Sequence, residues 1–166
     1  MNNLIIISVI FIIIGGAISV FSNLKQGEEK IELKYHYKRK NFFMSRAEHE
    51  CYDTLIKAIG NEYNIFPQVH LPTIVDQKVV GQNWNAAFRH ISQKSVDYVL
   101  TDKNYLSPKL VIELDDQTHE RQDRKDRDIE VERVLQDAGM PILRLENHGH
   151  FDPTEIAQKI HSIINK

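Results

Sequence analysis

Residues 4–21 form an uninterrupted apolar run of eighteen residues with no charge and no proline. A helix needs about 20 mostly apolar residues to cross the roughly 30 Å hydrocarbon core of a bilayer. The run therefore predicts one transmembrane helix, residues 1–22, that anchors the chain in a membrane. The remaining sequence is charged and periodic in hydrophobicity, which predicts one folded domain outside the lipid.

A cleaved secretory signal is the main alternative interpretation of this run. Such a signal opens with basic residues and ends at a small-residue cleavage site. Only three uncharged residues precede the run, and Ala17-Ile18-Ser19 is a weak cleavage site. The pattern therefore favours an uncleaved anchor over a signal, which would make the domain an exported protein, and over a buried core helix.

The residues that follow the run set its orientation. A polar linker, residues 23–41, carries six basic residues, whereas none precedes the run: Lys25, Lys30, Lys34, Lys38, Arg39 and Lys40. The positive-inside rule then places the C-terminal domain in the cytoplasm, on the inner side of the cytoplasmic membrane. The single cysteine, Cys51, agrees with that compartment, and it excludes a zinc ribbon of four thiolates.

The charge of the domain limits its partners. Residues 41–166 contain fifteen Lys and Arg against twenty Asp and Glu, a net charge of −5. A strong nonspecific nucleic-acid binder normally presents a basic face. The composition therefore counts against such a protein, and any hypothesis that the domain acts on DNA must account for this charge.

Hydrophobic periodicity predicts one α/β domain over residues 42–166. The first helix begins at a capping box, Ser45 with Glu48, and ends at Gly60. Strands follow at residues 63–71, 95–100, 109–115 and 141–146, with a short helix at 83–91. A charged helix at 119–138 buries a stripe consisting of Ile129, Val131, Val134, Leu135 and Ala138, and a last helix starts at a second capping box, Asp152 with Glu155. The order predicts a small mixed sheet flanked by helices.

Two of these strands carry acidic residues on one side. Because successive side chains of a strand point to opposite faces, one face holds only apolar residues. These are Val96, Tyr98, Leu100, Ile112 and Leu114. Asp97 in the first strand, and Glu113 and Asp115 in the second, point to the opposite face. If the two strands pair, the three carboxylates lie side by side.

Carboxylates that converge on a sheet repel one another and lose solvation. A divalent cation offsets both effects, and clustered oxygen ligands suit Mg²⁺, Mn²⁺ or Ca²⁺. In the alternative interpretation the acids line a solvated sheet face, where acidic residues are ordinary. Spacing alone does not decide between a metal site and a solvated face.

Several motifs occur here in a fixed order. They are Ser45-x-x-Glu48, Val96-Asp97-Tyr98-Val99-Leu100, Val111-Ile112-Glu113-Leu114-Asp115-Asp116-x-x-His119, the charged residues 124–128, and Gly139-Met140-Pro141-Ile142-Leu143-Arg144-Leu145. The series resembles the PD-(D/E)xK nuclease superfamily. It is most similar to the branch around very-short-patch-repair endonucleases and a set of uncharacterised bacterial domains. The resemblance covers residues 43–146, most of the domain.

The resemblance implies a restriction-endonuclease-like fold and hydrolysis of phosphodiester bonds in DNA with Mg²⁺ or Mn²⁺. It implies that Asp97 and Glu113 bind the metal and that Glu48 is a supporting acid. Asp115 occupies the position where the superfamily usually has a lysine, which orients the attacking water or stabilises the phosphate. Asp115 is then either a further metal ligand or the mark of a site that binds without cutting. His119 is the candidate acid or base, since its reference pKa of about 6.5 suits proton transfer near neutrality.

The second hypothesis is a noncatalytic, membrane-tethered module that keeps the nuclease fold and binds nucleic acid or protein. The missing lysine, the acidic domain and the anchor favour it. Other candidates carry less weight. Gln68 could reach the site but is interpreted as a surface amide, and Lys125 could replace the missing cation but is interpreted as a helix ion-pair partner. Trp84 with Phe88 is interpreted as packing for a loop in preference to stacking on a base. Arg144 is expected to pair with one of the clustered acids.

Overall fold

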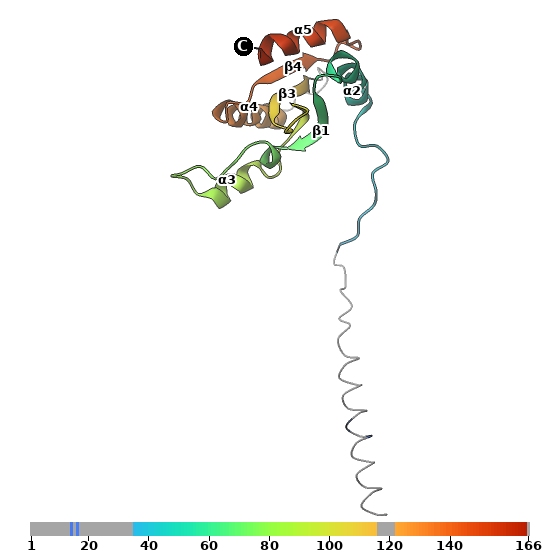
Figure 1. Cartoon of the computed structure of the whole chain (residues 1–166). Coiled ribbons are helices and arrows are strands. Elements are labelled where there is room, and N and C mark those ends of the chain that lie inside the picture. Colours follow the sequence, from blue (N-terminus) through green and yellow to red (C-terminus); the bar gives the residue numbers. More distant parts are fainter. Residues whose placement is uncertain (1–13, 15, 17–34, 116–121, 166) are drawn as a thin grey trace, which may run out of the picture. The chain divides into compact units, whose positions relative to one another are not determined.

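The computed structural model describes residues 14, 16, 35–115 and 122–165 (Figure 1). The chain divides into two units, Met1–Asn41 and Phe42–Lys166. Most of the predicted anchor and of the linker lies outside the described residues, so the transmembrane helix stays a prediction from sequence. In the part of the chain that is described, no helix is long and apolar enough to cross a membrane.

The second unit is built on a four-stranded sheet in the order β1-β2-β3-β4. The strands are β1 (Asn64–His70), β2 (Ser95–Thr101), β3 (Pro108–Asp115) and β4 (Ile142–Glu146). β1 pairs with β2, and β2 with β3, in antiparallel fashion, whereas β3 and β4 are parallel. Two parallel neighbours need a crossover connection, and the helix between them supplies it. The predicted mixed α/β class is confirmed.

Four α-helices occur among the described residues. They are α2 (Arg46–Ile59), α3 (Trp84–Ile91), α4 (Gln122–Asp137) and α5 (Pro153–Ile164), and a single 3₁₀ turn, η2 (Leu71–Thr73), follows β1. α4 is the crossover between β3 and β4. Every predicted helix and strand of the domain is present, with ends that differ by a few residues at most within the described part.

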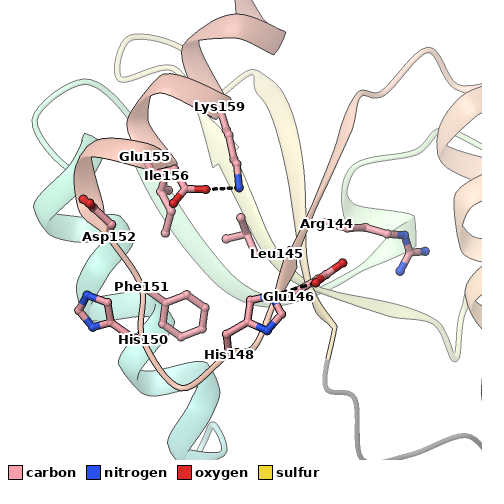
Figure 2. Close-up of a pocket in the computed structure, with 10 residues that line it drawn as sticks. All are labelled: Arg144, Leu145, Glu146, His148, His150, Phe151, Asp152, Glu155, Ile156 and Lys159. Atoms are coloured by element: carbon pink, nitrogen blue, oxygen red, sulfur yellow. Dashed lines mark ion pairs between the residues drawn. The ribbon is translucent and has the colours of Figure 1, made fainter.

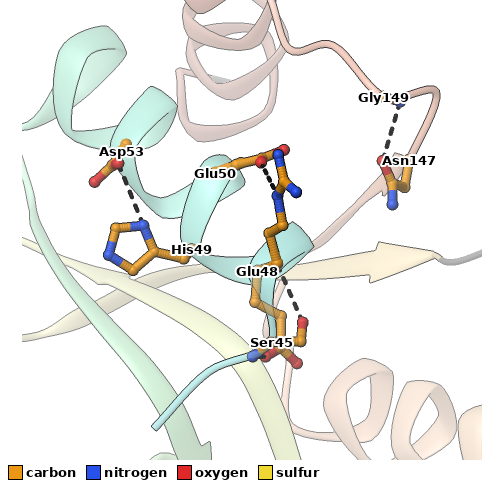
Figure 3. A network of polar contacts seen from close by, with 8 residues as sticks. Ser45, Glu48, His49, Glu50, Asp53, Asn147 and Gly149 are labelled. Carbon is orange, nitrogen blue, oxygen red and sulfur yellow. Dashed lines mark hydrogen bonds and ion pairs between the residues drawn. The ribbon is translucent and has the colours of Figure 1, made fainter. Parts of the chain in front are cut away.

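Local hydrogen bonds explain where the flanking helices begin. At α2, Ser45 Oγ accepts from the backbone N–H of Glu48 at 3.3 Å, and Glu48 Oε2 accepts from that of Ser45 at 2.6 Å, which is the predicted capping box (Figure 3). At α5, Asp152 Oδ1 accepts from the N–H of Thr154 at 2.8 Å. This bond caps the helix but is not part of the predicted box, which requires the N–H of Glu155. The Glu155 carboxylate lies 2.6 Å from Lys159 Nζ.

Both faces of the sheet are covered. α2 packs against α5 on one face, over a buried cluster that includes Leu55, Tyr98 and Ile160. On the other face α4 and η2 cover a second cluster that includes Val99, Val111, Val131 and Leu135. The alternating strand pattern predicts this division, except that Val96 packs in the second cluster. Val96 pairs with Val69, next to Gln68, whose φ of 54° interrupts the regular strand.

The predicted buried stripe of α4 is partly wrong. Val131 and Leu135 are buried and Val134 is half-buried, but Ile129 is 65% exposed and Ala138 is exposed. At 3.6 residues per turn, Ile129 lies about 200° around the helix from Val131 and faces away from the sheet. Ala138 follows the last helical residue, so helical spacing does not apply to it.

Candidate functional site

A row of four polar residues crosses the sheet from β1 to β4. Gln68 of β1 and Asp97 of β2 lie between two pairs of their ladder, Pro67 with Tyr98 and Val69 with Val96. Asp97 and Glu113 continue the antiparallel β2–β3 ladder, one step beyond its last pair. Glu113 in turn pairs with Arg144 of β4. The row therefore joins two of the predicted metal ligands to the expected partner arginine on one line across the sheet.

Asp97 and Glu113 form a half-buried carboxyl pair. Asp97 Oδ2 accepts the backbone N–H of Leu114 at 2.8 Å. Burial, with the neighbouring Asp97 charge and a hydrogen bond to it, raises the pKa of Glu113 to about 8. Burial also raises the pKa of Asp97, although its bonds from Leu114 and Glu113 oppose that shift. Both carboxyls therefore lose their protons less readily than exposed ones, and the hydrogen bond to Asp97 favours the protonated form of Glu113.

Glu48 is held beside this pair from α2. Its Oε1 accepts from Gln68 Nε2 at 3.2 Å, and its backbone carbonyl accepts the hydroxyl of buried Tyr98 at 2.6 Å. A positive φ is rare for a residue other than glycine and marks a backbone that its surroundings hold in place. The φ of 54° at Gln68 is such a case, and it accompanies the bond that ties β1 to Glu48.

Asp115 forms an ion pair with Arg144 of β4. Arg144 Nη1 lies 2.9 Å from Asp115 Oδ1, and Arg144 Nη2 lies 3.3 Å from Glu132 Oε2 of α4. The expected pairing of Arg144 with a clustered acid is thus present. The same guanidinium opposes the rise in the pKa of Glu113. Arg144 therefore brings a positive charge close to both Asp115 and Glu113.

The structure brings together four of the five predicted site residues. The charges of Glu48 and Asp115 both act on Asp97, and Glu113 shares a hydrogen bond with it. The fifth, His119, lies outside the described residues, and so does the side chain of Lys125. The acids of β2 and β3 therefore lie together as alternation predicts, and Glu48 of α2, which only the resemblance implied, lies near them.

Residues 40–163 match the family described as "Protein of unknown function (DUF2726)". The chain belongs to the DUF2726 family. The match covers the α/β domain together with the end of the linker. No curated protein and no solved structure matches the chain.

The carboxylates of Asp97 and Glu113 in this DUF2726 domain fit a small divalent cation that binds few protein ligands. Among the described residues, no group of three or more His, Cys, Asp or Glu side chains is arranged to hold a metal ion. Mg²⁺ commonly keeps several waters and binds through one or two carboxylates together with substrate phosphates. Asp97 and Glu113 supply two such carboxylates, and a cation would offset the cost of burying them.

A cavity of about 340 Å³ lies at the C-terminal end of β4 (Figure 2). The loop from His148 to Asp152 and the first turns of α5 line it, together with Arg144. Its charged groups form pairs: His148 Nε2 lies 2.9 Å from Glu146 Oε2, and Lys159 lies close to Glu155. Arg144 links this cavity to the carboxylate row.

Two residues of the DUF2726 site have a larger role than the sequence suggests. Tyr98 was expected only to fill the core, yet its hydroxyl fixes the turn that carries Glu48. A buried tyrosine hydroxyl needs a partner, and that need is the signal that could have identified it. Gln68 was interpreted as a surface amide. Its pairing with Glu48 depends on an unusual φ, which periodicity does not reveal.

Proposed function

We propose that this DUF2726 domain is a metal-dependent nuclease of the PD-(D/E)xK type that hydrolyses phosphodiester bonds in DNA. The observation that carries the proposal is the half-buried pair of Asp97 and Glu113. Burial raises the pKa of both carboxyls and so costs stability, which a purely structural role explains poorly. A site for a cation explains both their burial and their proximity.

Each residue of the site has a part in that chemistry. Asp97 and Glu113 would hold Mg²⁺ or Mn²⁺, which when bound supplies a Lewis acid and lowers the pKa of its water. Glu48, fixed by Gln68 and Ser45, adds a carboxylate beside the pair. Arg144 stabilises negative charge on the phosphate. His119, by its resemblance position, transfers a proton.

The acidic composition is compatible with this proposal. A bound divalent cation is the largest local charge of its site and reverses the electrostatics there. Arg144 adds a second positive charge next to Glu113. The phosphate therefore meets positive charge at the point of reaction although the domain as a whole carries a net negative charge.

The test uses the purified full-length chain in detergent, with Mg²⁺ or Mn²⁺ and with single- and double-stranded DNA and RNA. We expect DNA cleavage that requires the metal and that Glu113→Ala and Asp97→Ala each abolish. His119→Ala should lower the rate by roughly 10²–10⁴-fold, the usual effect of removing a positioned acid or base. Lys103→Ala, in the distant β2–β3 turn, is the matched control and should leave the rate unchanged.

A noncatalytic binding module is the second candidate, and the Asp115–Arg144 ion pair favours it. In that case Asp115 stands where the resembled superfamily has its lysine, and Arg144 already neutralises the charge of Asp115 within the protein. Calorimetry with Mn²⁺ separates the two candidates. Mn²⁺ binding that Glu113→Ala abolishes, without cleavage of any of the four substrates, would support the binding module.

We also propose that residues 1–22 anchor the chain in the inner membrane with the domain in the cytoplasm. The support is the uncharged run and the six basic residues that follow it. Membranes washed with carbonate should retain the full-length chain. A C-terminal tag should resist protease in intact spheroplasts, and its digestion there would show the opposite orientation.

A further inference from the structure

The connection between β1 and β2 projects from the end of the sheet that carries the candidate site (Figure 1). β1 ends two residues after Gln68, and β2 begins two residues before Asp97. The connection contains η2, a loop and α3. We refer to residues 77–94 of this connection as the β1–β2 arm. The arm is thus attached to the two strands that hold Gln68 and Asp97.

The arm exposes apolar and aromatic side chains. Trp84 and Phe88 are 50% and 45% exposed, and they lie four residues apart on α3, so they share one helix face. Trp84 Nε1 donates to the carbonyl of Val79 at 2.9 Å, which fixes the indole against the loop. One edge of Trp84 therefore packs against the loop, as the sequence-based interpretation states. Much of both rings is nevertheless exposed to solvent.

The charge of the arm is opposite to that of the rest of the domain. Residues 77–94 contain Lys78, Arg89 and Lys94 and no Asp or Glu. The fifteen basic and twenty acidic residues of 41–166 otherwise make the domain acidic. Arg89 is exposed on α3, directly after Phe88. Basic and aromatic side chains are therefore gathered on one short segment that is attached to β1 and β2, the strands of Gln68 and Asp97.

We propose that the β1–β2 arm binds a single-stranded nucleic acid and leads it to the carboxylate site. Aromatic rings bind unpaired bases by stacking, whereas the bases of a duplex keep their faces covered. Trp84 and Phe88 stack on bases, and Lys78, Arg89 and Lys94 bind the phosphates. This inference rests on the proposed nuclease function and adds to it a preference for single-stranded substrate.

Trp84 is the single tryptophan of the chain, so its fluorescence reports on the arm alone. The probe is an oligothymidylate of about 16 nucleotides, the upper end of the footprint of a small single-strand-binding fold. It is added to the full-length chain in detergent with EDTA, so that cleavage does not interfere. We expect the strand to quench Trp84, and the anisotropy of a labelled strand to rise over the same concentration range.

Variants then assign the binding to the arm. Phe88→Ala and Trp84→Ala should each weaken binding by about 5- to 100-fold, the usual contribution of stacking on one base. Arg89→Gln should weaken binding and reduce the slope of log affinity against log salt by about 0.7. Tyr105→Ala and Lys103→Gln are the matched controls, because both residues are exposed in the β2–β3 turn, and they should change neither quantity.

Three outcomes would overturn the assignment. They are the absence of strand binding at low salt, strand binding that the arm variants leave unchanged, and a blue shift of Trp84 with phosphatidylserine vesicles but no response to the strand. The last outcome would assign the arm to a lipid surface. Cleavage is scored separately with Mn²⁺ on duplex DNA, so metal-dependent cutting of a duplex with no strand binding would remove the arm proposal and leave the nuclease proposal standing.

Discussion

The two ends of β2 and β3 hold acidic residues in opposite electrostatic conditions. At the turn end, Asp102 accepts the backbone N–H of Tyr105 at 2.7 Å and lies 3.5 Å from Lys109 Nζ. That backbone bond and the nearby lysine lower the pKa of Asp102. At the other end, burial raises the pKa of both Asp97 and Glu113. Asp102 therefore stabilises the turn, whereas the burial of Asp97 and Glu113 costs stability, which the proposed metal ion would offset.

The largest predicted difference between the two strand ends is in metal-dependent cleavage. Glu113→Gln keeps the size of the side chain and removes its charge, so the site loses a metal ligand. We expect metal-dependent cleavage to fall to the background rate, a loss of at least about 10³-fold in kcat. The control at the opposite end, Asp102→Asn, should cleave like the wild type. Equal losses in both variants would mean that general stability, and not the site, limits the rate.

The second prediction concerns stability against pH. The pKa of Glu113 rises from 4.5 unfolded to about 8 folded, so the folded state holds more protons between these values. Its contribution to stability is complete below pH 4.5 and is lost as the pH rises through 8. The free energy of unfolding should fall over this range by roughly 5 kcal/mol at most, at 1.36 kcal/mol per pKa unit. Urea denaturation at a series of pH values measures this fall.

Two variants sharpen the pH experiment. Glu113→Gln cannot ionise and should flatten the decline between pH 4.5 and 8. Asp102→Asn should leave the decline in place, because the lowered pKa of Asp102 makes its stabilisation disappear only as the pH falls below 3.8. If the wild type and Glu113→Gln show the same slope, the Asp97–Glu113 pair is solvated, and the comparison between the two strand ends fails.

Alternation along the strands was sufficient to place three acids on one side of the sheet. Asp97, Glu113 and Asp115 were predicted from the period of two, and strand pairing then fixed their order in space. The expectation that Arg144 pairs with one of the clustered acids is confirmed, although alternation did not indicate which acid. Local rules also located the start of α2, because a capping box depends on residues only three apart.

What the sequence did not reveal depends on distant contacts or on single dihedral angles. Gln68 reaches Glu48 across twenty residues through a φ that no pattern encodes. Trp84 and Phe88 have the spacing of a buried helix face, yet in α3 the pattern does not show whether anything covers them. The engagement of Asp115 by Arg144 depends on which strand becomes the parallel neighbour of β3, and that is decided by the whole fold.

A third prediction asks whether Arg144 takes the part of the missing lysine. Arg144→Gln should lower cleavage by about 10²-fold, as expected when one stabilising donor is lost. Adding Asp115→Lys to that variant places a cation on the adjacent position and should restore part of the rate. Lys109→Gln removes the cation at the turn end and is the control, with no expected change in rate. A double variant no better than Arg144→Gln alone would remove the charge-stabilising role from Arg144.

The smallest expected effect is on the free energy of unfolding, and it tests whether the strained backbone at Gln68 serves to position Glu48. Two residues other than glycine have positive φ among the described residues, Gln68 at 54° in the site and Leu106 at 56° in the turn. The left-handed region costs such a residue roughly 1–2 kcal/mol, and glycine relieves most of that cost while adding chain entropy to the unfolded state. Leu106 is 54% exposed, so Leu106→Gly should raise the free energy of unfolding by about 0.5–1 kcal/mol in urea denaturation.

Gln68→Gly gains the same relief but loses the bond to Glu48, so its stability should stay within about 0.5 kcal/mol of the wild type while its cleavage rate falls. A gain in stability at Gln68 equal to that at Leu106, with no loss of activity, would show that the strain at the site does not serve to position Glu48.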